Sequence, residues 1–162
     1  CLMDLKTDLL LAEFRKLKLI STDTRKITSG SIFFALKGGN FNGNKFASEA
    51  LEKGATLVVT DEDTDSDPSR TIRVPEVLTA LQHLATAYRK TLQAKIIAIT
   101  GSNGKTTTKE LLTLVLSRKY KTFSTQGNLN NHIGVPLTLL SVPPDTEYVV
   151  LELGANHLNE IA

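Results

Sequence analysis

One stretch of the sequence limits the fold more than any other: a continuous apolar run, then a glycine-rich turn, then a helical pattern. Residues 96–100 read Ile-Ile-Ala-Ile-Thr, which is typical of a strand buried on both faces of a parallel sheet. The turn Gly-Ser-Asn-Gly follows at 101–104, and a helix is predicted over 106–118. Because strand, tight turn and crossover helix form the repeating unit of parallel α/β sheets, this part of the chain is predicted to be an α/β domain.

The remainder of this domain continues the same alternation. A second strand is predicted at 122–123, a short helix at 132–140 and a third strand at 148–153. Parallel sheets usually contain more than three strands, and the sequence stops within the pattern of a further helix. We therefore predict that residues 93–162 are the first, incomplete part of a parallel sheet domain. We also expect the chain to be a fragment of a larger protein.

The N-terminal part predicts a separate, small mixed α/β domain. Apolar periodicity and β-type runs indicate helices at 2–19, 45–53 and 76–90, and strands at 32–36, 56–60 and 71–74. Two stretches rich in glycine and asparagine, 38–40 and 42–44, are predicted to be surface loops. The domain boundary is predicted near residues 91–94, so that the first domain comprises residues 1–92.

Composition excludes several classes of protein. The 162 residues include 19 Lys plus Arg and 17 Asp plus Glu, and the resulting charge of +2 argues against binding to nucleic acid by phosphate neutralisation. No apolar run approaches the ~20 residues of a membrane span, and the N-terminal stretch does not have the pattern of a secretory signal. The single cysteine, Cys1, cannot form an internal disulfide. We expect a cytoplasmic monomer.

The glycine-rich turn contains the residues that a phosphate-binding loop requires. Gly101 and Gly104 let the backbone approach a polyphosphate, while Lys105 can reach the β- and γ-phosphates and the Thr106 hydroxyl can ligate their shared Mg²⁺. A glycine turn with a surface lysine is the alternative. Ile99 stands where the general G-x-x-x-x-G-K-[ST] pattern has its first glycine, so the loop is the shorter G-x-x-G-K-T-T form. Residues 93–162 are therefore predicted to be part of a P-loop-type domain that binds ATP. The predicted ATP-binding residues are Gly101, Ser102, Asn103, Gly104, Lys105, Thr106 and Thr107.

A carboxylate and a histidine follow the third predicted strand of this domain. Ligands of open α/β sheets bind outside the carboxyl ends of the strands, which places Glu152 beside the phosphate loop. A carboxylate there can hold Mg²⁺, and His157 can serve a second divalent ion. We predict Thr106, Glu152 and His157 as metal ligands, and Lys105, Glu152 and His157 as catalytic residues. For Glu152 taken alone, a solvated strand end is the alternative.

An asparagine-rich segment lies between these two motifs. Asn128, Asn130 and Asn131 offer amide donors and acceptors without charge, which suits recognition of a nucleotide or a substrate. We predict these three residues to bind substrate. Asparagines also suit loop turns and the N-cap of a helix, and that interpretation stays open.

Several segments resemble one known family. The run Ala-Ile-Thr-Gly-Ser-Asn-Gly-Lys-Thr-Thr-Thr-Lys-Glu at 98–110 resembles the ATP loop of the Mur ligases of peptidoglycan synthesis. The segments 127–140 and 152–157 resemble the members of this family that add D-alanyl-D-alanine. In the first domain, 23–26 and 33–38 resemble the family's uridine-nucleotide-binding segment. The similarity extends from about Ser21 to the last residue.

The resemblance implies an ATP-dependent amide ligase that uses Mg²⁺. ATP would phosphorylate the terminal carboxylate of UDP-N-acetylmuramoyl-tripeptide, and the amine of D-alanyl-D-alanine would attack the acyl phosphate. The resemblance also implies that Thr24 and Arg25 hold the UDP part of the substrate. Where the family often has Asp-Gly-His, residues 42–44 are Asn-Gly-Asn, so no uracil or diphosphate contact is assigned there. The family's carbamylated lysine and its C-terminal domain would lie beyond Ala162, so the fragment alone is predicted to lack ligase activity.

Three other interpretations remain open at this point. A sibling ligase that adds the third peptide residue, or a folylpolyglutamate synthase, would share the G-x-x-G-K-T-T loop, although the asparagine-rich segment disfavours both. A P-loop switch without ligase chemistry would need no pocket for a UDP-sugar. The chain could also be only a folding unit that retains no ligand.

Overall fold

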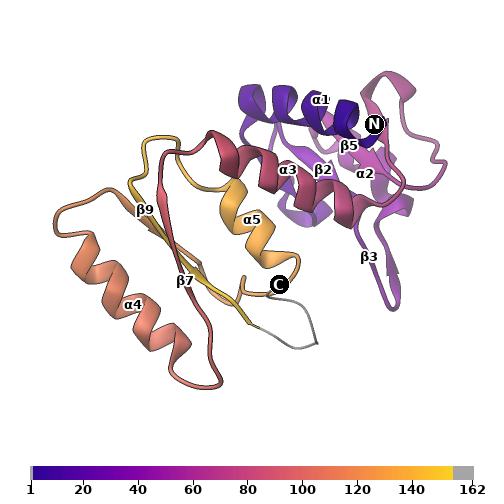
Figure 1. Ribbon diagram of the computed structural model, residues 1–162. Helices are drawn as coiled ribbons and strands as arrows, with labels where there is room; N and C mark the ends of the chain where they lie inside the picture. Colours follow the sequence, from indigo (N-terminus) through magenta and orange to yellow (C-terminus); the bar gives the residue numbers. More distant parts are fainter. Residues whose placement is uncertain (1, 155–162) are drawn as a thin grey trace. The chain divides into compact units, whose positions relative to one another are not determined.

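The structure is a computed structural model that describes residues 2–154 (Figure 1). Its contacts divide into two compact units, Cys1–Ala87 and Tyr88–Ala162. The division falls inside the helix α3 (Val77–Thr91), which therefore contributes to both units. Each unit is built around its own parallel sheet, whereas the sequence analysis predicts a parallel sheet for the second unit and only a mixed α/β domain for the first.

The first unit contains a four-stranded parallel sheet in the order β1-β2-β5-β6. These strands are β1 (Ile20–Ser21), β2 (Ile32–Phe34), β5 (Leu57–Thr60) and β6 (Thr71–Arg73). The helices of this unit are α1 (Leu2–Leu17), α2 (Ala47–Glu52) and the first turns of α3, with short 3-10 turns at Thr24–Lys26, Gly43–Phe46 and Pro68–Arg70. Because all four strands run in the same direction, their carboxyl ends lie at one edge of the sheet.

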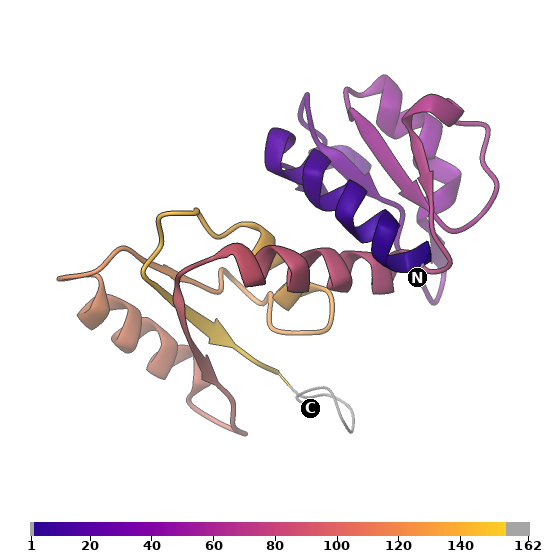
Figure 2. The same ribbon diagram turned by 45° about the horizontal axis from the view of Figure 1, so that its top comes forward.

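Side chains cover both faces of this sheet. Phe33 and Val58, which are register partners, pack in a cluster with the alanines of α2. Successive strand residues alternate between faces, so Ile32, Phe34 and Val59 point the other way, and all three are fully buried. The helices α1 and α3 lie along that second face in both views (Figures 1 and 2).

A small hairpin in this unit differs from the sequence-based expectation. Residues 38–44 are predicted to be surface loops, but β3 (Lys37–Gly38) and β4 (Phe41–Asn42) pair as antiparallel strands. Gly43 and Asn44 are buried. A Cβ atom on Gly43 would lie 2.6 Å from the backbone carbon of Ala35, so the glycine allows the hairpin to approach the end of β2.

The second unit contains a three-stranded parallel sheet in the order β7-β9-β8. Its strands are β7 (Lys95–Ile99), β8 (Thr122–Ser124) and β9 (Tyr148–Glu152). The helix α4 (Lys105–Leu116) lies along one side of the sheet and α5 (Gly134–Leu140) lies on the other (Figures 1 and 2). The central strand, β9, is buried along almost its whole length. Among the described helices, none combines the length and the apolar character needed to cross a bilayer.

Candidate functional site

The loop between β7 and α4 has the backbone geometry of a phosphate-binding turn. Gly101 and Gly104 have φ angles of 147° and 75°, a region that favours glycine because it lacks a Cβ atom. The ammonium of Lys105 donates a hydrogen bond of 2.6 Å to the carbonyl of Gly101, which holds the lysine side chain across its own loop. The positive end of α4 and a cation therefore lie at the same turn, which suits a polyphosphate.

Glu152, at the end of β9, joins three segments of the second unit. The register pairs Ile99 of β7 with Glu152, so the phosphate loop leaves the sheet beside this carboxylate. One carboxylate oxygen accepts a hydrogen bond of 3.0 Å from the Thr106 hydroxyl, and the other accepts one of 2.9 Å from the Asn130 amide. The structure thus brings together residues from the phosphate loop, the asparagine-rich segment and the third strand.

The electrostatic setting of Glu152 fits a bound cation. The residue is 4% exposed, and both of its described side-chain partners are neutral. Within residues 2–154, no Lys, Arg or His is recorded in an ion pair with this carboxylate. A buried carboxylate without a countercharge is costly, and the carboxylate and hydroxyl oxygens of Glu152 and Thr106 are hard ligands of the kind that Mg²⁺ takes.

The protein supplies few metal ligands in the part of the chain that the structure describes. No group of three or more His, Cys, Asp or Glu residues that could hold a metal ion occurs there. Mg²⁺ at Glu152 and Thr106 would therefore take its remaining ligands from phosphate oxygens and water, as is usual for this ion. His157, the third predicted ligand, lies outside the described residues.

Two of the three asparagines in the asparagine-rich segment have a structural role. The Asn131 side-chain oxygen accepts hydrogen bonds from the N–H groups of Ile133 (3.1 Å) and Gly134 (2.8 Å), which fixes the turn that leads into α5. This helix begins at residue 134 rather than 132. Asn130 supports Glu152, and its carbonyl also accepts a hydrogen bond from the N–H of Gly154. Asn128 is exposed. Substrate binding by these residues stays a prediction.

Two buried residues of this site escaped the sequence analysis. Lys109, on α4, donates a hydrogen bond of 2.8 Å to the carbonyl of Thr125, and the Thr125 hydroxyl accepts one of 2.9 Å from the N–H of Glu152. The sequence does contain a signal for Lys109, because it precedes Leu112 and Leu116 by three and seven residues and so shares their helix face. Thr125 shows no comparable signal.

In the first unit, Arg25 is held by its neighbour Asp23 just beyond the end of β1. The guanidinium donates to both carboxylate oxygens, with an Nη2–Oδ2 distance of 2.7 Å, and the arginine side chain is 84% exposed. This pairing holds the pKa of Asp23 far below its usual range and raises the pKa of Arg25. Thr24 lies in the same turn.

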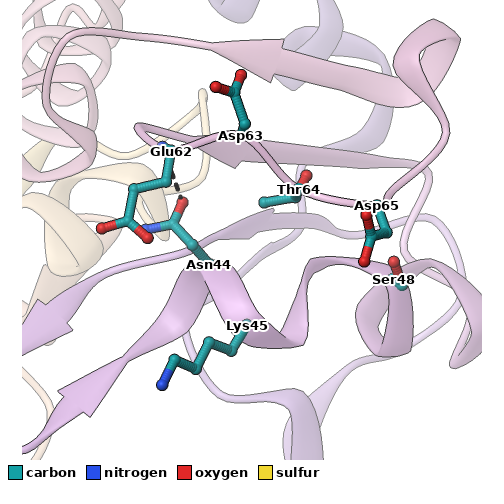
Figure 3. Close-up of a pocket in the computed structure, with 7 residues that line it drawn as sticks. All are labelled: Asn44, Lys45, Ser48, Glu62, Asp63, Thr64 and Asp65. Carbon is teal, nitrogen blue, oxygen red and sulfur yellow. Dashed lines mark hydrogen bonds between the residues drawn. The ribbon is translucent and has the colours of Figure 1, made fainter.

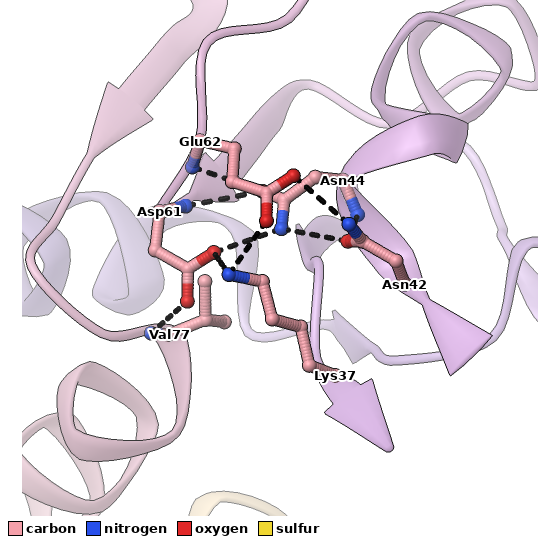
Figure 4. A network of polar contacts seen from close by, with 6 residues as sticks. All are labelled: Lys37, Asn42, Asn44, Asp61, Glu62 and Val77. Atoms are coloured by element: carbon pink, nitrogen blue, oxygen red, sulfur yellow. Dashed lines mark hydrogen bonds and ion pairs between the residues drawn. The ribbon is translucent and has the colours of Figure 1, made fainter. Parts of the chain in front are cut away.

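A second polar group in the first unit joins the hairpin to the end of β5 (Figure 4). The ammonium of Lys37 lies 2.9 Å from Asp61 and 2.8 Å from Glu62. Asn44 donates to the Asp61 carboxylate at 2.8 Å, and its own oxygen accepts from the N–H of Asp61. Asn42 donates to Glu62 at 2.9 Å. These five residues are called the hairpin network below.

The hairpin network lowers the pKa values of its two carboxyl groups. Burial raises the pKa of Asp61, but hydrogen bonds from Lys37, Asn44 and the N–H of Val77 outweigh it, and the net pKa falls below the ordinary value. Hydrogen bonds from Lys37 and Asn42 likewise lower the pKa of Glu62.

A polar pocket of about 320 Å³ adjoins this network (Figure 3). It lies beside the start of α2 and the segment that follows β5. Its lining residues are Asn44, Lys45, Ser48, Glu62, Asp63, Thr64 and Asp65.

Comparison with known proteins confirms the family that the sequence resembles. The profile of the Mur ligase middle domain matches residues 99–162, and that described as "Mur ligase family, catalytic domain" matches residues 16–89. The chain belongs to the Mur ligase family. Both units described above thus contain a segment shared with other Mur ligases.

Two curated relatives in the Mur ligase family bear the same enzyme name. The chain is 45% identical to the UDP-N-acetylmuramoyl-tripeptide–D-alanyl-D-alanine ligase of Bacillus subtilis, over 88% of this chain and 32% of that protein. It is 43% identical to the ligase of the same name from Escherichia coli, over 96% of this chain and 35% of that protein. The chain therefore spans about a third of the length of these curated relatives.

Solved structures of Mur ligases confirm the fold. A crystal structure of MurF from Acinetobacter baumannii superposes with a TM-score of 0.84 at 42% identity, over 90% of this chain and 32% of that one. MurF from Thermotoga maritima in complex with ADP superposes with a TM-score of 0.82 at 32% identity, over 90% of this chain and 34% of that one.

Proposed function

We propose that the chain is the substrate- and nucleotide-binding part of an ATP-dependent ligase. This ligase joins D-alanyl-D-alanine to UDP-N-acetylmuramoyl-tripeptide. The observation that carries the proposal is the meeting of Lys105, Thr106 and Glu152 at one edge of the second sheet, in a chain whose relatives bear this activity in their names. Residues 1–92 are proposed to hold the UDP-linked substrate, and residues 93–162 the first part of the ATP site.

In this proposal the loop 101–107 holds the triphosphate of ATP. Its glycines admit the phosphates to the backbone, and the first N–H groups of α4 donate to phosphate oxygens. The Lys105 ammonium moves from the Gly101 carbonyl to the phosphates, where it offsets negative charge on the transferring phosphoryl group. The ADP complex of the Thermotoga maritima relative supports a nucleotide in this family's fold.

Glu152 and the Thr106 hydroxyl would hold Mg²⁺ beside that loop. The ion, when bound, supplies positive charge that stabilises the phosphoryl group during transfer. The protein's own contribution is to fix both ligands: Asn130 orients the Glu152 carboxylate, and the start of α4 orients Thr106. His157 is proposed as a further ligand and catalytic residue.

The reaction then proceeds in two steps. The terminal carboxylate of the tripeptide attacks the γ-phosphate of ATP, which yields an acyl phosphate and ADP. The amine of D-alanyl-D-alanine attacks the acyl carbon, so that an amide forms and inorganic phosphate leaves. Thr24 and Arg25 are proposed to bind the UDP part, and Asn128, Asn130 and Asn131 are proposed to recognise the substrate near the reacting groups. Holding the distant UDP part in place positions the carboxylate for attack.

Two measurements test this function. Calorimetric titration of the chain should detect binding of ADP that strengthens with Mg²⁺, and binding of UDP that does not compete with ADP. In the full ligase that carries these residues, phosphate release should require D-alanyl-D-alanine. Release driven by a diaminoacid instead would assign a sibling ligase, and nucleotide binding without UDP binding would favour a P-loop switch.

A further inference from the structure

Lys109 is a buried lysine to which none of the roles above applies. It lies on α4, one turn after Lys105, and only 2% of its surface is exposed. Burying an ammonium group costs free energy unless its hydrogens are bonded. Two partners are present: the Thr125 carbonyl at 2.8 Å and the carboxylate of Glu110 at 2.9 Å, whose own side chain is 65% exposed.

Thr125 links this ammonium to the candidate metal ligand. The residue follows β8 directly, and its N–H donates to the carbonyl of Val150 on β9. Its carbonyl accepts from Lys109, and its hydroxyl accepts from the N–H of Glu152. Thr125 is 1% exposed, so these protein contacts take the place of water at the point where the chain leaves the sheet for the asparagine-rich segment.

We propose that Lys109 is a positioning residue of the nucleotide and metal site. Its ammonium fixes Thr125, and Thr125 fixes the backbone of Glu152, while Thr106 and Asn130 fix the carboxylate of the same residue. The role of Lys109 in catalysis rests on the proposed function, whereas the positioning of Glu152 can be measured without any ligand.

Fold stability alone does not explain why an ammonium group is buried at this position. An apolar side chain of similar length would fill the space and avoid the cost of burying a charge, and such exchanges are often neutral or stabilising. What an apolar side chain lacks is a donor for the Thr125 carbonyl, which accepts no other described hydrogen bond. The substitution Lys109→Met therefore removes the positioning contact and preserves most of the packing.

The first experiment measures amide hydrogen exchange by NMR in the full chain without nucleotide. We expect Lys109→Met to accelerate exchange at the Glu152 N–H by about 5-fold to 10-fold, relative to the N–H of Val150 in the same strand, since a net hydrogen bond of about 1 kcal/mol is weakened. Lys121→Met is the matched control, because Lys121 is an exposed lysine paired with Asp145 and makes no recorded contact with Glu152. The control should leave the ratio of the exchange rates at Glu152 and Val150 unchanged.

The second experiment is a double-mutant cycle on Mg²⁺ affinity at saturating ADP. Loss of a residue that orients a metal ligand typically costs about 10-fold or more in metal affinity, which is the effect expected for Lys109→Met. In the Glu152→Gln background the same substitution should have no further effect, since the ligand that it positions is already gone.

The outcomes separate this inference from the proposed function. Equal acceleration at Glu152 and Val150, or additive effects in the cycle, would overturn the positioning role of Lys109. If the wild-type chain binds ADP with no dependence on Mg²⁺, the proposed function fails instead, and the exchange ratio alone decides the role of Lys109.

Discussion

Acidic side chains stand at the carboxyl ends of both parallel sheets, and the two sets have different partners. In the first unit, Asp61 and Glu62 share the ammonium of Lys37. In the second, the described partners of Glu152 are an uncharged hydroxyl and an uncharged amide. In the first arrangement one ammonium is paired with both carboxylates and joins a hairpin to a strand. In the second, no cationic partner of Glu152 is recorded within residues 2–154, which is the property expected of a metal site.

The largest expected effect comes from the loop beside Glu152. Lys105→Ala should weaken ADP binding by about 10-fold to 100-fold, because a charged hydrogen bond to phosphate is lost. The melting temperature should change little, since the recorded hydrogen bond of this ammonium stays within its own loop. Titration calorimetry and thermal unfolding measure the two quantities. Unchanged affinity would remove the phosphate-binding role of the loop.

Replacing one acid in each unit by its amide should have opposite effects on stability in the two units. Glu152→Gln should weaken Mg²⁺ binding about 10-fold, so that ADP binding loses most of its dependence on Mg²⁺. The free energy of unfolding should stay equal or rise, because a buried charge is removed. Asp61→Asn should destabilise the chain by about 1–3 kcal/mol, because Lys37 loses a charged partner. Urea unfolding of both variants measures the contrast, and a loss of stability in both would contradict it.

The close approach of the hairpin can be tested with a pair of glycines. Gly43→Ala should cost about 1–3 kcal/mol, because the added Cβ atom would meet the backbone of Ala35 and displace Asn44 from the hairpin network. Gly39→Ala is the matched control, since a Cβ atom there meets nothing within 4 Å. Equal unfolding midpoints for the two variants would show that the hairpin network does not depend on the close contact between Gly43 and the backbone of Ala35.

The smallest expected effect is a dependence of stability on acid pH. The pKa values of Asp61 and Glu62 are lowered in the folded chain, so their pairing with Lys37 stabilises the fold above the unfolded pKa values near 4, and this stabilisation is lost as the pH falls through the folded values. The difference in urea midpoint between wild type and Lys37→Met should therefore shrink from about pH 6 to about pH 3. A constant difference would mean that Lys37 acts by packing alone.

Local pattern was enough to predict the second sheet and its loop. The apolar run at 96–100, the glycines at 101 and 104 and the strand ending at Glu152 each carry their own signal, and the parallel arrangement follows from their order. The rule that ligands bind at the carboxyl ends of parallel strands then placed Glu152 beside the loop.

Contacts between distant residues account for what the sequence did not predict. Asn44 is buried because it bonds Asp61, seventeen residues away, and no local pattern distinguishes it from the asparagine of an exposed turn. Lys109 is buried because Thr125, sixteen residues away, needs a donor. Asn131 was open to two interpretations. Its side-chain oxygen accepts from the N–H of Gly134 at the start of α5, and its role toward a substrate stays a prediction.

The two carboxylate oxygens of Glu152 accept hydrogen bonds from different segments of the second unit. The oxygen that faces Thr106 lies on the side of the phosphate loop, whereas the other is engaged by Asn130. An ion bound there as proposed would replace the hydroxyl contact and leave the amide contact in place. The segment held by Asn130 would then need no rearrangement, so little ordering entropy would be lost on binding.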